Sequence, residues 1–70
     1  MTRQVLKLQD SGRRFIVTFM EGQPRNPYTL YELTWDGGEH RRQIVKYQNL
    51  ESCLYHLAQS GLFKKDYFPA

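Results

Sequence analysis

The chain has 70 residues, which is enough for one small domain with a modest hydrophobic core, so a single domain is expected in these residues. Hydrophobic residues make up 40% and charged residues 24% of the sequence, proportions that are typical of a folded domain rather than a disordered chain. The net charge of +3 is a weak basic bias, so charge alone neither demands nor excludes a nucleic-acid partner.

Four segments are predicted to form β-strands. They cover residues 4–9, 14–20, 28–35 and 40–47. Gly12 suits a tight turn between the first two strands because glycine adopts a positive φ freely, and Gly37-Gly38 suits a turn between the last two. Pro24 and Pro27 favour a loop between the second and third strands, since proline cannot donate a ladder hydrogen bond. Short connections favour pairing of the strands in sequence order.

One helix is predicted after the strands. Apolar side chains recur with the i, i+3, i+4, i+7 spacing of a single helical stripe at Leu50, Cys53, Leu54 and Leu57. Asn49 suits the N-cap and Gly61 the C-terminal cap. The sequence therefore predicts one α+β domain over residues 1–70, with residues 63–70 as a tail. Its core is a small antiparallel β-meander of three to four strands, β-β-β-β-α, with the C-terminal helix on one face.

The expected compartment is the cytoplasm. Cys53 is the only cysteine, so no internal disulfide can form, which fits a reducing environment. No apolar segment follows Met1, so no secretory signal is expected. The longest apolar run is too short to span a bilayer, and no membrane partner is expected.

A sheet covered by one short helix keeps its second face uncovered. Strand alternation assigns one set of side chains to the helix side: Leu6, Leu8, Phe15, Val17, Phe19, Tyr31, Leu33, Trp35, Val45 and Tyr47. It assigns an apolar stripe with charged neighbours to the other side. The residues of this predicted protein interface are Ile16, Met20, Tyr28, Leu30 and Ile44. The first hypothesis is therefore a small non-enzymatic binding module that forms a homodimer or contacts another protein through this face.

The alternative hypothesis is nucleic-acid binding by one end of the sheet. In a meander of four strands, the turn between the first and second strands and the turn between the third and fourth strands lie at the same end of the sheet. Basic doublets are expected to gather at this end beside an aromatic side chain. The candidate residues are Arg13, Arg14, Trp35, Arg41, Arg42, Lys64 and Lys65, with Tyr67 as a second stacking ring. Asp36 and Glu39 lie at the same end, so an ordinary solvated surface of mixed charge is the competing interpretation. The pattern does not distinguish DNA from RNA.

No residue pattern points to catalysis, a metal or another cofactor. Cys53 and His56 have the i, i+3 spacing of a ligand pair, but a structural zinc site needs four ligands and no second pair completes it. Cys53 also falls in the apolar stripe of the helix, where a free cysteine behaves as a small hydrophobic residue. His40 lies on a turn beside Asp36 and Glu39 without a framework that would hold a general base in place.

Overall fold

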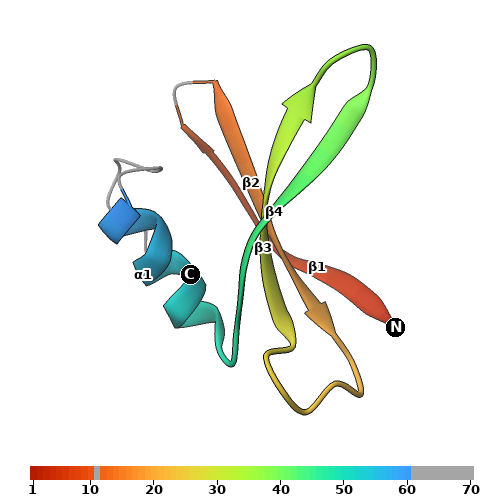
Figure 1. Ribbon diagram of the computed structural model, residues 1–70, viewed down its shortest axis with the longest axis vertical. Helices are drawn as coiled ribbons and strands as arrows, with labels where there is room; N and C mark the ends of the chain where they lie inside the picture. The colour runs from red at the N-terminus through yellow and green to blue at the C-terminus, as the bar shows by residue number, and fades with distance from the viewer. Residues whose placement is uncertain (11, 61–70) are drawn as a thin grey trace.

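The computed structural model describes residues 1–10 and 12–60. These residues form a four-stranded antiparallel sheet in the strand order β1-β2-β3-β4, followed by one helix (Figure 1). The elements are β1 (Thr2–Asp10), β2 (Arg13–Met20), β3 (Tyr28–Trp35), β4 (Glu39–Tyr47) and α1 (Leu50–Ser60). The predicted α+β meander is confirmed. The predictions for Gly61 and the 63–70 tail lie outside the described residues.

The two tight hairpin turns share one end of the sheet, and the β2–β3 loop lies at the other (Figure 1). Gly12 has a φ of +81° and Gly37 a φ of +69°, a region that side chains with a Cβ rarely adopt. The amide of Asp36 donates to the carbonyl of Gly38 at 3.0 Å, which closes the β3–β4 turn. The glycines predicted to form these two turns therefore do so.

The β2–β3 loop is held by two glutamine side chains. Gln23 Nε2 donates to the carbonyl oxygens of Arg25 and Asn26 at 2.9 and 3.0 Å. Gln48, which follows β4, accepts from the Asn26 amide at 3.0 Å and donates to the Pro24 carbonyl at 3.1 Å. The loop between the prolines is therefore anchored to the segment that leads into α1.

Helix α1 begins where the sequence predicts and lies against β3 and β4 (Figure 1). The Asn49 side-chain oxygen accepts from the Ser52 amide at 2.9 Å, which confirms Asn49 as the N-cap. Cys53 and Leu57 are buried at 0% and 1% exposure. The Tyr47 hydroxyl and His56 Nδ1 share a hydrogen bond of 2.9 Å, which joins the end of β4 to the helix.

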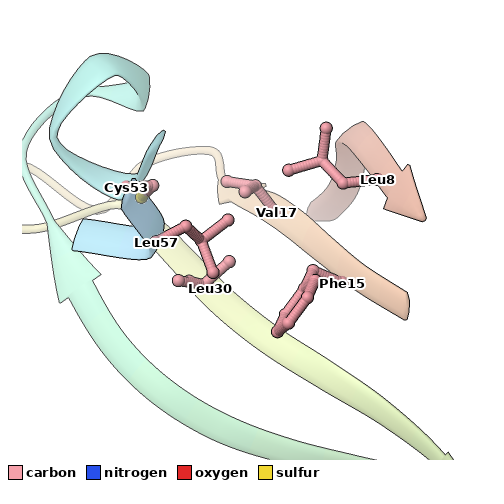
Figure 2. Close-up of a cluster of buried hydrophobic side chains, with 6 residues drawn as sticks. All are labelled: Leu8, Phe15, Val17, Leu30, Cys53 and Leu57. Carbon is pink, nitrogen blue, oxygen red and sulfur yellow. The ribbon is translucent and has the colours of Figure 1, made fainter. Parts of the chain in front are cut away.

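The hydrophobic core lies between α1 and one face of the sheet, which we call the helix side (Figure 2). Its buried members come from β1, β2, β3 and α1: Leu8, Phe15, Val17, Leu30, Cys53 and Leu57. In Figure 2 the side chains of Leu57 and Leu30 lie next to each other, with Cys53 and Val17 close by. The helix stripe predicted from its spacing therefore packs on the sheet as expected.

The predicted facing of β3 is wrong. Leu30 is the ladder partner of Val17, and Tyr28 is the partner of Phe19, so both lie on the helix side. Tyr31 is paired with Ile16 and therefore lies on the opposite face, together with Leu33 and Trp35. Both alternating sets of β3 are apolar, so the pattern by itself does not choose between them.

Two bulges change the alternation on the edge strands. The register shifts between Gln4 and Leu6 in β1, and opposite Leu30 and Tyr31 in β4, which leaves Val5 and Ile44 as extra residues. Both extra residues are partly buried against the core. The second bulge places Arg42 opposite Glu32 on the helix side, and it makes Ile44, which was predicted to lie on the other side, an extra residue that packs against the core.

Candidate functional site

The candidate site is the face of the sheet opposite α1, which we call the open face. The ladder register arranges its side chains in three rows that cross all four strands. From β1 to β4 the rows read Gln9–Arg14–Leu33–Arg41, Lys7–Ile16–Tyr31–Gln43 and Gln4–Thr18–Thr29–Lys46. Trp35 and Glu39 form a further pair beside the first row, next to the β3–β4 turn.

The centre of the open face is closed and its two edges are exposed. Ile16 is 1% exposed and Leu33 is 8% exposed, although α1, the helix of the described residues, lies on the other side of the sheet. The β1 and β4 side chains of the three rows are exposed, and they are amides or cations: Gln4, Lys7, Gln9, Arg41, Gln43 and Lys46. The expected bare apolar stripe is therefore absent from the middle of this face.

The five residues of the predicted protein interface do not share a surface. Ile16 and Met20 lie on the open face, where Met20 is 40% exposed at its end. Leu30 is fully buried in the core, and Tyr28 and Ile44 pack against that core from the helix side. The misassigned facing of β3 and the bulge at Ile44 account for the split.

The open face carries an excess of positive charge. Its cations are Lys7, Arg14, Arg41 and Lys46. Within the described rows Glu39 is the sole carboxylate, and Arg14 Nη1 lies 3.8 Å from its Oε1. This distance is long for an ion pair between partly exposed groups, so the pair contributes little to stability, and four cations against one carboxylate leave the face positive. The face therefore presents cations from three of its strands.

The predicted basic end is divided between the two faces of the sheet. Arg14, Arg41 and Trp35 lie on the open face, whereas Arg13 and Arg42 lie on the helix side. Consecutive residues of a strand point to opposite faces, so a basic doublet cannot act as a unit on either face. Lys64, Lys65 and Tyr67 lie outside the described residues.

Sequence reasoning missed the edge residues of the open face. Lys7 and Lys46 lie on this face but are not among the residues that the sequence predicts for either site. The missed signal is a regular spacing of amides and cations on the first and fourth strands, including Gln9 and Gln43. Edge strands commonly carry charges that prevent further pairing, so this pattern alone is not specific.

Two aromatic side chains of β3 lie on the open face. The Arg41 guanidinium lies over the Tyr31 ring, 5.7 Å from its centroid, in a cation–π contact. Trp35 is 73% exposed, and among described residues no ring or cation is placed against it. The face thus offers one aromatic ring that is already capped by arginine and one whose faces are accessible.

Arg13 and Arg42 on the helix side both bind Glu32. Arg13 donates to both carboxylate oxygens at 2.9 and 3.0 Å, and Arg42 donates to one of them at 2.7 Å. The Arg13 hydrogen bonds hold the pKa of Glu32 below its ordinary value against the opposing effect of burial, and the Arg42 bond acts in the same direction. Glu32 in turn raises the pKa of Arg13. Arg13 and Arg42 therefore stabilise the fold by pairing with the buried carboxylate.

Cys53 and His40 are each accounted for by contacts of the described residues. Burial raises the pKa of the Cys53 thiol to about 11, which keeps it protonated and unreactive. His40 Nε2 donates to the Asp36 carbonyl at 3.2 Å within the β3–β4 turn. Over the part of the chain that the structure describes, no three His, Cys, Asp or Glu side chains lie close enough to share a metal ion. No helix in that part is long and apolar enough to cross a membrane.

No family model, curated protein or solved structure matches this chain. The class of protein that fold and site define is a small α+β domain with a polar, cationic sheet face. Its role therefore has to be argued from that face alone.

Proposed function

We propose that this chain is a small non-enzymatic binding module whose open face takes a nucleic acid. The observation that carries the proposal is the composition of that face. Lys7, Arg14, Arg41 and Lys46 contribute positive charge, and Glu39 is the opposing carboxylate among the described residues. Cations spread over a surface suit a polyanion, because each phosphate neutralised releases bound counterions.

The other side chains of the face suit the same ligand. Gln4, Gln9 and Gln43 are exposed beside the cations. An amide side chain offers a donor and an acceptor together, which matches the edges of nucleic-acid bases. Exposed Trp35 adds a ring that can stack on a base. The face therefore combines groups for phosphates with groups for bases.

The packing of the sheet supports recognition by a preformed surface. The centre of the open face is closed by buried side chains such as Ile16 and Thr18, which are 1% and 4% exposed. The exposed cations rise from strands rather than from loops, and a rigid scaffold lowers the entropic cost of ordering a binding surface. The backbone beneath Lys7 and Arg41 is therefore expected to move little on binding.

The test measures binding to labelled mixed-sequence oligonucleotides by fluorescence anisotropy. Binding is expected at low salt, with affinity falling steeply between about 50 and 200 mM salt. If each of the four cations neutralises one phosphate, the logarithmic salt slope is about −3 for a single strand. A salt-independent affinity, or no binding at the low-salt limit, would refute the proposal.

Matched charge variants locate the surface. The double variant K7Q/K46Q removes two exposed cations from the open face and is expected to weaken binding and flatten the salt slope. The control R3Q/R25Q removes the same charge elsewhere, since Arg3 lies over the Phe19 ring and Arg25 is on the β2–β3 loop. Equal losses in both variants would indicate nonspecific attraction to net charge.

Self-association or contact with a protein is the second candidate function. Its support is the exposure of two large apolar side chains of the open face, Trp35 at 73% and Met20 at 40%. They lie near opposite ends of the sheet, so they do not form one patch. The mass measured by light scattering at high protein concentration tests it, with a strict monomer counting against a homodimer.

A further inference from the structure

We infer that the open face takes a single strand and that Trp35 is the platform on which an unpaired base stacks. This inference rests on the proposed nucleic-acid function and names the form of the ligand. Trp35 is the last residue of β3 and is 73% exposed. Tryptophan carries a large apolar ring, so a position this exposed leaves much hydrophobic area in water unless a partner covers it.

The surroundings of Trp35 suit a charged, planar partner. Its ladder partner is Glu39, whose carboxylate lies 3.8 Å from Arg14, and Arg41 is in the adjacent row. Cations close to an accessible aromatic face can hold the phosphates on either side of a stacked base. The carboxylate can accept a hydrogen bond from an amino group on the edge of a base.

Tyr31 provides a second platform on the same strand. It lies four residues before Trp35 on the same face, which is about 13 Å along β3 at the usual rise per residue. Arg41 already lies over its ring at 5.7 Å. A guanidinium on a ring is itself a flat surface on which a base can stack. The aromatic groups and Arg41 therefore mark a path along β3.

The chemistry of this path favours unpaired bases. In a duplex the faces of the bases are covered by their neighbours, so an aromatic side chain reaches them only in a strand whose bases can unstack. The positive charges of Lys7, Arg14 and Lys46 can attract the phosphates of a single strand or of a duplex equally. The exposed ring of Trp35 is what distinguishes the single strand as the ligand.

Tryptophan fluorescence tests the inference directly, because Trp35 is the only tryptophan in the chain. The probe is a short mixed-sequence DNA or RNA oligonucleotide, titrated as a single strand and as its duplex. Quenching of Trp35 by the single strand, with little quenching by the duplex at equal occupancy, is the expected result. Occupancy is measured separately by anisotropy of a label on the oligonucleotide.

Substitutions separate stacking from charge attraction. W35A is expected to weaken single-strand binding about tenfold, because loss of one stacked ring typically costs a factor of this order. W35F is expected to recover part of the loss. The matched control is Y55A, since Tyr55 also carries a largely exposed aromatic ring, 67% exposed on α1. Both substituted sites are exposed, and circular dichroism checks that each of the three variants is folded.

The outcomes are distinguishable. Duplex binding without Trp35 quenching, with W35A equal to the unaltered protein, would overturn the stacking inference and leave the proposed nucleic-acid function standing. No binding of either form at low salt would overturn both. A blue shift of Trp35 emission that grows with protein concentration alone would assign the ring to self-association instead.

Discussion

Arg13 and Glu32 form a bidentate ion pair across the β2–β3 ladder on the helix side of the sheet. Glu32 is 8% exposed, and Arg42 from β4 completes its hydrogen bonds at 2.7 Å. The carboxylate therefore joins three strands at one point. Because these arginines are paired with Glu32, they add little to any basic surface, and the excess positive charge of the sheet lies on the open face.

Replacement of Glu32 by glutamine is expected to destabilise the fold. The side chain keeps its shape but loses charge-assisted hydrogen bonds from two arginines. Those arginines are 42% and 62% exposed, so water can hydrate them after the change. We expect a loss of about 1.5 kcal/mol in the free energy of unfolding, the lower end of the range for hydrogen bonds to charged groups. Urea unfolding followed by circular dichroism measures it.

The control for this change is E39Q. Glu39 also pairs with an arginine, but at 3.8 Å and with its side chain 49% exposed. Its replacement is expected to change stability by less than about 0.5 kcal/mol. A similar loss in both variants would mean that burial and geometry do not distinguish the two carboxylates.

The lowered pKa of Glu32 makes stability depend on pH in the acidic range. As the pH falls, the unfolded chain binds a proton at Glu32 near the ordinary value of 4.5, before the folded chain does. The stabilisation is therefore complete above that value and is lost as the pH falls through the lower folded pKa. The unfolding free energy of E32Q should fall less steeply over this range. Parallel pH profiles for both proteins would contradict the assignment.

The Cys53 thiol is expected to react slowly with thiol reagents in the native protein. Its ionisation in the unfolded chain is expected to lower the free energy of unfolding at alkaline pH. Its pKa is raised from 9.0 to about 11 by burial, so the unfolded chain loses the thiol proton first as the pH rises. Stability is therefore lost progressively between these two values. Labelling with a thiol reagent at neutral pH should be fast in urea and slow in the native protein. Fast native labelling would show that the thiol is accessible.

Substitutions of Leu30 and Met20 test which apolar side chains belong to the core. Both were predicted to lie on one exposed face, yet Leu30 is 0% exposed and Met20 is 40% exposed. Leu30→Ala should cost about 2–5 kcal/mol, enough to unfold much of a small domain. Met20→Ala should cost less than about 1 kcal/mol. Thermal unfolding measures both, and equal costs would contradict the observed register.

The order and approximate bounds of the elements follow from local patterns in the sequence. The β-branched and aromatic content of Arg13–Met20, the glycine turns and the Asn49 cap all act within a few residues. Which side of the sheet each residue of Tyr28–Trp35 faces cannot be predicted from the strand itself, because both of its alternating sets of side chains are apolar. Glu32 does not indicate the buried set either, because the arginines that compensate its burial come from other strands.

The candidate site was harder to predict for the same reason. A bulge at Ile44 reverses the facing of the preceding residues of β4 relative to those that follow. No residue type in that strand marks the bulge in advance. The charges of Lys7 and Arg41 are visible in the sequence, but their membership of one face depends on the register of all four strands. The basic doublets are conspicuous in the sequence, but the two members of a doublet in a strand point to opposite faces of the sheet.

Gln48 is expected to hold the β2–β3 loop through two hydrogen bonds. Its side chain accepts from the Asn26 amide and donates to the Pro24 carbonyl. Gln48→Ala should expose the Asn26 amide to water and speed its hydrogen exchange, while global stability falls by less than about 1 kcal/mol because the site is exposed. Gln48→Glu keeps the acceptor, so it should preserve protection of Asn26 while losing the bond to Pro24.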